Sequence, residues 1–457
     1  MASAAAPRGY DYETTEAGGI KVACRDFPAP TTTLTVVAKA GSRYQPLPGY
    51  ADTLANFAFK STSKRSALRI TRESELLGGE FSAYNSRENV VLTAKFLSSD
   101  LPYYAELLAE VISNTRYPAH ELDEVVFDLV KFSQNNSIAN PSIHALDAVH
   151  NVAFHRGLGN PLVPCPSAPM KQYITAEGVA AFSKSAYTKA TTAVVSSGAN
   201  ASEVSKWVGQ FFSDVPASAA NGPFAALAGE PAQYFGGEQR IASQSGNAMV
   251  IAFPGSSSFG TKGYKAEYDV LAALLGGQSS IKWSAGSSIL AKATEGVSGV
   301  SISTKHATYS DAGLLCVTLS GNAGSLGQAG KNVVDAIKKI ASGNIASEDI
   351  KKAIAFAKFR ALESGQNLTT GVELTGSALV HGSKPFQIVQ VGQNIEKVTE
   401  EQVKAVCISS FPPDSFISSN LSIVLQAAKS LLAGRASVAS VGDLFHLPYA
   451  SDLGLTV

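Results

Sequence analysis

Hydrophobic and polar positions in the first half of the chain follow the two periods that distinguish strands from helices. β-Branched runs and period-two alternation, bounded by Pro and Gly, predict strands at 20–25, 32–40, 81–85, 89–97 and 191–197. Apolar residues at helical spacing predict helices at 49–62, 66–77 and 99–114, two more within 121–155, one from Thr175 and one over 203–212. Hairpins and helices therefore alternate along the chain, as in folds that pack helices against sheets.

The second half of the chain repeats this pattern. Gly18-Gly19, which precedes the first strand, recurs 218 residues later as Gly236-Gly237. The hairpin at 84–92 recurs at 308–316, and the helix start at Thr175 recurs at Thr399, both 224 residues later. A nearly constant offset over such a distance predicts two copies of one domain.

Composition marks the boundaries of the two copies. We expect a disordered N-terminal stub at 1–16, a first domain at 17–213, a linker at 214–234 rich in Ala, Gly, Pro and Asn, and a second domain at 235–457. The first ten residues are rich in Ala and contain no acidic residue. This composition fits the remainder of a cleaved organellar transit peptide and, equally well, an ordinary disordered terminus.

We also predict a 20-residue insertion at 407–426 in the second copy. The strand end at 194–198 recurs at 438–442, which is 244 residues later, so twenty residues have been added after the match at Thr399. Removing 407–426 joins two pieces of helical pattern, whereas the segment itself contains Pro412-Pro413 and many serines. We hypothesise that it is a retained intron translated in frame. An ordinary surface insertion is the alternative, because loops tolerate added residues.

Composition and charge argue against several classes of function. Lys and Arg together number 37 and so do Asp and Glu, which gives no broad basic field for nucleic-acid binding. No run of eighteen residues is continuously apolar, so we predict no membrane-spanning helix. The four cysteines are widely separated and form no C-x-x-C pair, which indicates idle thiols rather than disulfides or a structural zinc site.

The stretch Gly49–Thr62 carries the candidate chemistry. Its positions 52, 55 and 56 have the spacing of the H-x-x-E-H motif but hold Asp52, Ala55 and Asn56, and Phe59-Lys60-Ser61-Thr62 follows. With two homologous halves, this stretch resembles the pitrilysin-type (M16) zinc peptidases, in which Phe-Lys-Gly-Thr follows the motif. Runs similar to the mitochondrial branch of that family lie at 37–44, 67–79, 309–314 and 440–449. That branch contains the subunits of the mitochondrial processing peptidase and the core proteins of the cytochrome bc1 complex, including fungal ones.

The resemblance places the three metal ligands at Asp52, Asn56 and Ser133 and the general base at Ala55. Asn is a poor zinc ligand and Ala moves no proton, and residues 129–141 contain no Asp or Glu. We therefore expect a degenerate zinc site with no bound metal and no peptidase activity. The histidines at 144, 150 and 155 do not share one helix face, so we expect no other metal site among them.

The resemblance also implies a fold and a role. The fold is α+β, with two homologous α/β-sandwich domains, each a largely antiparallel sheet covered by helices on one side, that enclose a crevice. The role is that of a non-catalytic subunit of respiratory complex III on the matrix side of the mitochondrial inner membrane. It pairs with core protein 1, meets the membrane only through protein contacts, and needs no cofactor, nucleic acid or small-molecule substrate. The first alternative is a non-catalytic, presequence-binding subunit of the processing peptidase, although the glycine-rich loop expected there has only three glycines in the stretch 276–286. The second alternative is an active peptidase with a rearranged site.

Overall fold

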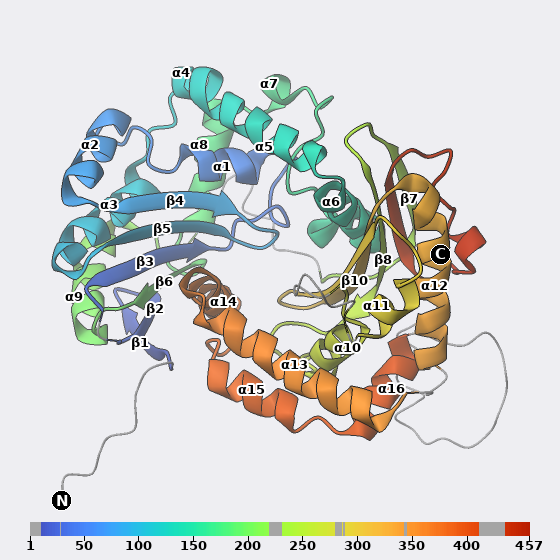
Figure 1. The fold of residues 1–457 in the computed structure, drawn as a ribbon. Coiled ribbons are helices and arrows are strands. Elements are labelled where there is room, and N and C mark those ends of the chain that lie inside the picture. The colour runs from blue at the N-terminus through green and yellow to red at the C-terminus, as the bar shows by residue number, and fades with distance from the viewer. Residues whose placement is uncertain are drawn as a thin grey trace, which may run out of the picture. The chain divides into compact units, whose positions relative to one another are not determined.

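The computed structural model describes residues 11–27, 29–218, 231–278, 286, 288–341, 345–410 and 435–457. The chain forms two compact units, and neither is continuous in sequence. Unit 1 contains residues 1–135, 160–230 and 363–389, and unit 2 contains residues 136–159, 231–362 and 390–457. Each unit is built around one β-sheet (Figure 1). Within the described residues, no helix combines the length and the apolar character needed to cross a bilayer.

Unit 1 has a six-stranded sheet with the order β1-β2-β6-β3-β5-β4. Its strands are β1 (Glu13–Ala17), β2 (Ile20–Arg25), β3 (Thr31–Ala38), β4 (Glu80–Asn85), β5 (Val90–Leu97) and β6 (Thr192–Ser197). All neighbouring strands are antiparallel except β2 and β6, which run parallel. The predicted hairpin at 81–85 and 89–97 is therefore present as β4 and β5.

Helices cover both faces of this sheet. Side chains of successive strand residues point to opposite faces, and in unit 1 apolar side chains from both faces pack against helices. Val22 and Val194 belong to the core that includes α1 (Tyr50–Phe57), α3 (Leu101–Asn114), α8 (Ala176–Ala186) and α9 (Ala201–Phe211). Their neighbours Ala23 and Val195 pack on the opposite face with Val372 of α14 (Leu368–Val380). The prediction of helices on one side only is thus wrong for unit 1, and it is wrong for unit 2 as well, where α6 (Pro141–Phe154) packs on one face of the sheet and α10 (Glu267–Leu275) and α12 (Ala323–Ala341) pack on the other. The remaining helical elements are α2 (Ala67–Leu77), η1 (Ser98–Asp100), α4 (Ala119–Glu121), the π-helical turn η2 (Leu122–Val126), α5 (Phe127–Ala139), α7 (Met170–Tyr173) and η4 (Phe212–Asp214).

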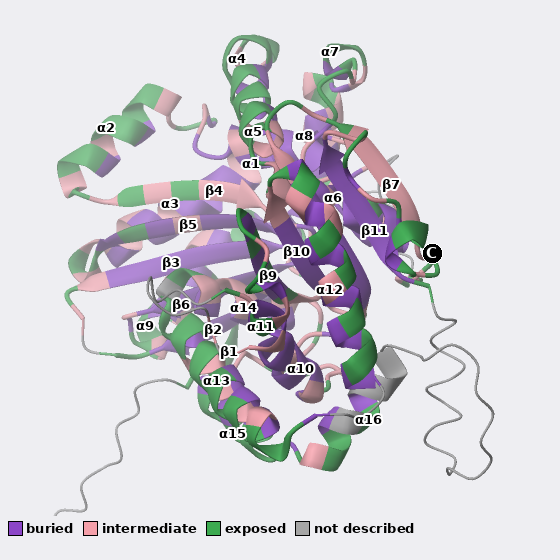
Figure 2. Cartoon of the chain, turned by 45° about the vertical axis from the view of Figure 1, so that its right-hand side comes forward, coloured by how far each residue is buried: buried purple, intermediate pink, exposed green. Residues whose placement is uncertain are grey.

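Helix α14 lies very close to the sheet. A Cβ atom added to Gly376 would come within 2.3 Å of the Val37 side chain, so only glycine allows this approach. Figure 2 shows β3 and β5 in the buried colour, whereas α2 is exposed along most of its length. The core of unit 1 therefore lies on both sides of the central strands.

Unit 2 has a five-stranded sheet with the order β7-β11-β8-β10-β9. Its strands are β7 (Gly237–Ala242), β8 (Asn247–Gly255), β9 (Val300–Thr308), β10 (Gly313–Gly321) and β11 (Ser437–Gly442). Helix α6 (Pro141–Phe154) packs Ala145, Val149 and Ala153 against one face. The other face is covered by α10 (Glu267–Leu275), α12 (Ala323–Ala341) and α16 (Glu400–Ser410). Other elements are η3 (Gly157–Gly159), α11 (Ile289–Thr294), α13 (Ser347–Gln366), α15 (Ile388–Glu396) and η5 (Ser451–Leu453).

The internal repeat is visible in the strand order. Strands β2-β6-β3-β5-β4 of unit 1 correspond one by one to β7-β11-β8-β10-β9 of unit 2, with the same parallel pair and the same antiparallel pairs. Gly198 and Gly442, which follow the equivalent strands β6 and β11, both have positive φ, at 93° and 131°. The fold class predicted from the sequence, two homologous α/β domains with largely antiparallel sheets, is confirmed.

The two copies exchange one helix each. Helix α6 comes from the first half of the chain and packs on the sheet of unit 2, whereas α14 comes from the second half and packs on the sheet of unit 1. The compact units therefore differ from the predicted domains at 17–213 and 235–457 by this exchange. The boundaries remain a prediction at the level of the sequence repeat, as does the crevice between the domains.

Two further expectations concern the ends of the domains. The predicted stub at 1–16 is wrong at its C-terminal end, because Glu13–Ala17 forms β1 and pairs with β2. This edge strand is almost entirely polar and exposed, so it gave no apolar pattern to detect. In the predicted insertion at 407–426, residues 407–410 continue α16. Positions 411–426, like linker residues 219–230 and residues 1–10, lie outside the described residues.

Candidate functional site

Helix α1 is positioned by its N-terminal end and by its burial. Gly49 has a left-handed backbone (φ 100°), and the side-chain oxygen of Gln45 accepts hydrogen bonds from the N–H groups of Gly49 and Ala51 at 3.1 and 3.2 Å. Seven of its eight residues are buried. The helix contacts β4, β5, α8 and the π-helical turn η2. It is a core element in which Asp52 and Thr53 are enclosed by protein and Asn56 is half-buried.

Asp52 and Asn56 pair with each other across one turn of α1. The Asn56 amide donates to the backbone oxygen of Asp52 at 2.9 Å and to its Oδ1 at 3.0 Å. Asp52 is 5% exposed, and its Oδ2 has no hydrogen-bond partner among the residues that the structure describes. Burial raises the pKa of the Asp52 carboxyl from its usual 3.8 to about 7, and the bond from Asn56 offsets only part of that rise. The amide of Asn56, which the resemblance places at a ligand position, thus holds one carboxylate oxygen of Asp52.

The other two predicted site residues supply no reactive group. Ala55, which the resemblance places at the position of the general base, is 3% exposed and has only a methyl side chain. Ser133 is half-buried on α5, next to Gln134, which donates to the backbone oxygen of Pro164 at 2.9 Å. Within the described part of the chain, no group of three or more His, Cys, Asp or Glu side chains is arranged to hold a metal. The assignment of Ser133 as the third ligand position stays a prediction.

In the run Phe59–Thr62, the side chains of Phe59, Ser61 and Thr62 all contact the surrounding protein. Phe59 adopts a left-handed backbone (φ 61°), is buried, and stacks on Phe81 with ring centres 4.4 Å apart. The hydroxyl of Ser61 donates to Glu121, and the hydroxyl of Thr62 donates to the buried Glu110 of α3. Helix α1 ends at Phe57, because the backbone of Ala58 leaves the helical region (ψ 139°), and this end is earlier than that of the predicted helix at 49–62.

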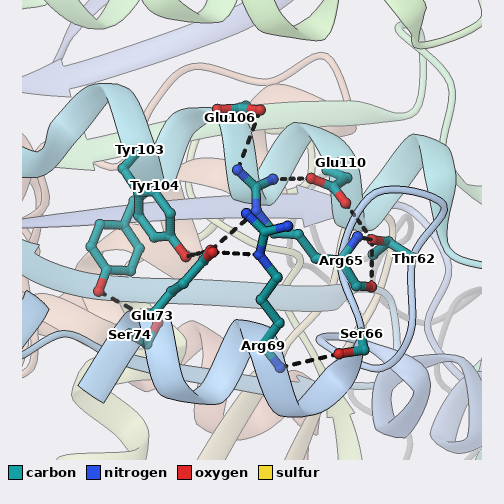
Figure 3. A network of polar contacts seen from close by, with 10 residues as sticks. All are labelled: Thr62, Arg65, Ser66, Arg69, Glu73, Ser74, Tyr103, Tyr104, Glu106 and Glu110. Carbon is teal, nitrogen blue, oxygen red and sulfur yellow. Dashed lines mark hydrogen bonds and ion pairs between the residues drawn. The ribbon is translucent and has the colours of Figure 1, made fainter. Parts of the chain in front are cut away.

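Thr62 belongs to a larger polar network around Arg65 (Figure 3). The Arg65 guanidinium, 10% exposed, pairs with Glu110, with Glu73 at 3.2 Å and with Glu106 at 3.4 Å. Burial alone lowers the pKa of Arg65, but the charges of Glu110 and Glu106 outweigh it and raise that pKa. The network therefore ties the loop after α1 to α2 and α3.

This network was not predicted from the sequence. The run of basic residues Lys60, Lys64, Arg65, Arg69 and Arg72 predicts a solvated basic face, and this prediction is wrong for Arg65, which pairs with the buried Glu110. The sequence did contain a pattern that could have predicted the network. Tyr103, Glu106 and Glu110 recur at helical spacing beside the apolar face of α3. Two acidic residues on a mostly apolar helix indicate a basic partner.

The remaining candidates from the sequence do not form a site. The imidazole of His150 contacts the backbone oxygen of Leu146 at 2.6 Å and the hydroxyl of Tyr309 at 2.8 Å, so both of its nitrogens have protein partners. His155 stacks on Phe235 at 4.2 Å. In the stretch 276–286, residues 279–285 lie outside the described residues.

Comparison with known proteins gives the family. The profile described as Insulinase (Peptidase family M16) matches residues 21–166, and the profile described as Peptidase M16 inactive domain matches residues 173–356. A Neurospora crassa protein named cytochrome b-c1 complex subunit 2, mitochondrial, is 47% identical over 457 residues, which cover 100% of this chain and 94% of that protein.

Proteins of the same name give similar coverage at lower identity. The protein from Cryptococcus neoformans var. grubii is 36% identical over 97% of this chain and 94% of its own length. The human protein is 27% identical over 98% of this chain and 93% of its own length. The prediction that the chain is not a working peptidase is confirmed by these relatives and by the match to the inactive domain. The chain therefore belongs to the insulinase-type M16 peptidase family, as a non-catalytic member similar along its whole length to cytochrome b-c1 complex subunit 2.

Proposed function

We propose that this chain is a non-catalytic structural subunit of mitochondrial respiratory complex III, in the role of core protein 2. The observation that carries the proposal is the identity of 47% to a protein named as subunit 2 of that complex over the entire chain. A match over both units, rather than over one, favours a role that uses the whole fold. Haem, iron–sulfur and quinol chemistry then belong to other subunits.

The geometry of α1 supports a role without turnover. Hydrolysis by a zinc peptidase needs three ligands, an open coordination position and a base that accepts a proton from water. Here Asn56 binds Asp52 instead of a metal, and Ala55 has no proton acceptor. The M16 framework is kept without its reactive groups, which is what a scaffold requires.

The finer parts of the proposal concern place and partner. We infer that the chain lies on the matrix side of the inner membrane, pairs with core protein 1, and attaches through protein contacts. The support is the resemblance to the mitochondrial branch of the family, in which M16-type subunits act in pairs.

Native mass spectrometry of mitochondrial extracts tests the role. We expect the chain to co-migrate with haem b in an inner-membrane assembly, at one copy per cytochrome b, and to carry no stoichiometric zinc. A chain found only in a soluble heterodimer that cleaves presequences would contradict the proposal and support the peptidase-subunit alternative. Zinc at one equivalent per chain would contradict the non-catalytic interpretation of α1.

A further inference from the structure

Helix α13 carries a row of exposed side chains on one face. The row consists of Lys352, Phe356, Phe359 and Glu363, at successive spacings of four, three and four residues. With 3.6 residues per turn, these positions lie within an arc of about 60° around the helix axis. Phe356 is 47% exposed, Phe359 is 57% exposed, and their rings stack with centres 6.5 Å apart. The row therefore presents two neighbouring aromatic rings between a cation and an anion.

The opposite side of α13 is packed against the protein, so the helix cannot turn these rings inward. Ile350, Ala353 and Ala357 are buried there, at 1%, 4% and 5% exposed. Lys358, at the edge of this side, pairs with Glu396 of α15 at 2.9 Å. Figure 2 shows exposed residues recurring along α13. Because water disfavours apolar surface, two neighbouring exposed rings on a packed helix indicate a contact with another molecule.

The order of the row makes it complementary to itself. In an antiparallel pair of α13 helices centred between positions 357 and 358, Phe356 of each copy meets Phe359 of the other. The same register places Lys352 of each copy against Glu363 of the other. A two-fold contact makes every such pairing twice, so the row supplies an aromatic centre and an ion pair at both ends. A parallel pair would instead place Lys352 against Lys352, which is unfavourable.

We propose that α13 is a contact surface for a second copy of this chain, through the row Lys352, Phe356, Phe359 and Glu363 in antiparallel register. The proposal goes beyond the role in complex III and does not depend on it, because it concerns a contact between two identical chains. The observation that selects a second copy is the charge complementarity of the row with its own reverse.

The charges beside the row are compatible with this contact. Glu348 pairs with Lys352 at 2.7 Å, but the two side chains are 77% and 59% exposed, so the pair is weak and both can take new partners. The Arg360 guanidinium lies 5.7 Å from the centre of the Phe356 ring, one turn before Glu363. Each end of the contact gathers Arg360 and Glu363 of one copy with Glu348 and Lys352 of the other. Two cations and two anions therefore meet at each end.

The other charged residues of α13 lie to the side of the row. Asp349 pairs with Lys292 of α11 at 3.9 Å. Lys351 and Lys358 lie about 110° and about 130° around the axis from the centre of the row. They therefore point away from a helix that packs on the row.

The contact is small, and its size sets the expected strength. Stable interfaces bury about 1,200–2,000 Å² of total surface, and a row that spans three helical turns buries less. We therefore expect a dissociation constant in the micromolar range for the isolated chain. In a larger assembly that holds two copies nearby, the high effective concentration keeps such a contact closed.

Sedimentation equilibrium of the purified full-length chain tests the proposal. Lys352→Glu and Glu363→Lys each place like charges opposite one another, and each should raise the dissociation constant about tenfold. The double variant Lys352→Glu with Glu363→Lys restores opposite charges and should recover the wild-type value, which a folding defect would not do. Lys351→Glu makes the same charge change outside the row and should leave the constant unchanged.

The aromatic centre is tested in the same assay. Phe359→Ala should raise the dissociation constant about tenfold, as for truncated interface anchors. Phe132→Ala on α5, where Phe132 is 65% exposed, removes an equally exposed ring and should have no effect. The Tm of both variants should match that of the wild type, because both side chains are exposed.

A photo-crosslinking residue at position 359 identifies the occupant and its register. A crosslink to residues around Phe356 of a second copy supports the proposal. A wild-type chain that stays monomeric up to about 100 μM overturns it, as does a double charge variant that stays as weak as the single variants. A crosslink in mitochondrial extracts only to a different protein also overturns it.

Discussion

The network around Arg65 allows a quantitative test of what the loop after α1 contributes to stability. Arg65→Ala leaves Glu110, whose side chain is 1% exposed, without its cation. Removal of one partner from a buried ion pair costs about 3–5 kcal/mol, because the remaining charge stays desolvated. We therefore expect the free energy of unfolding of unit 1 to fall by that amount.

Two companion variants separate charge burial from other effects. Arg69 pairs with Glu73 at 2.6 Å, but the Arg69 side chain is 60% exposed, so Arg69→Ala should cost less than about 1 kcal/mol. Replacing both members of the buried pair, as Arg65→Met with Glu110→Leu, removes the unpaired charge. The double variant should therefore recover most of the loss seen in Arg65→Ala.

Tryptophan fluorescence during urea unfolding is a suitable assay. The chain has two tryptophans, and Trp207 lies on α9 against the core of unit 1. In a Trp283→Phe background, fluorescence reports on unit 1 alone. If Arg65→Ala and Arg69→Ala shift the urea midpoint equally, or if the double variant is less stable than Arg65→Ala, the argument from charge burial is refuted.

Three further predictions concern α1 and the run Phe59–Thr62. Burial raises the folded-state pKa of Asp52 from its usual 3.8 to about 7. The stability of the protein relative to Asp52→Asn should therefore be lost as pH rises from about 4 through about 7, by on the order of a few kcal/mol. Urea midpoints measured across that pH range check this. Thr62→Val keeps the shape of the side chain but removes the bond to buried Glu110, so it should cost about 1–3 kcal/mol, more than Ser61→Ala at the half-buried neighbouring position. The combination Asp52→His, Ala55→Glu, Asn56→His and Ser133→Glu should bind one zinc by elemental analysis; equal affinity without Ser133→Glu would show that Ser133 is not the third ligand position.

The sequence predicted those features that depend on neighbours along the chain. The hairpin of β4 and β5 follows from alternation at 80–97, and the end of α2 follows from Gly78, which has a left-handed backbone at φ 71°. The repeat emerged from glycines and helix starts at constant spacing. Its hydrogen-bonded turns, Ser86 to Asn89 and Tyr309 to Ala312, are equivalent at an offset of 223 rather than 224 residues.

The features that were missed depend on partners far away in sequence. The exchange of α6 and α14 between units leaves no local signature, because either helix presents a similar apolar face to a similar sheet. Strand β1 is held by pairing with β2, and Ala17 is its only buried residue. The pairing of Arg65 with Glu110 joins residues 45 positions apart. Local periodicity reports which face is buried but not which element buries it.

The contrast within Gly49–Thr62 follows from these contacts. The resemblance places Asp52 and Asn56 at metal-ligand positions and Ala55 at the position of the general base. The fold needs only side chains that fit the buried surroundings of α1, and the Asn56–Asp52 pair and the Ala55 methyl meet that need. Phe59, Ser61 and Thr62 have specific partners in Phe81, Glu121 and Glu110, so their replacement costs stability whether or not zinc is present. Loss of catalysis therefore frees the first group to change, while packing and buried charge hold the second group in place.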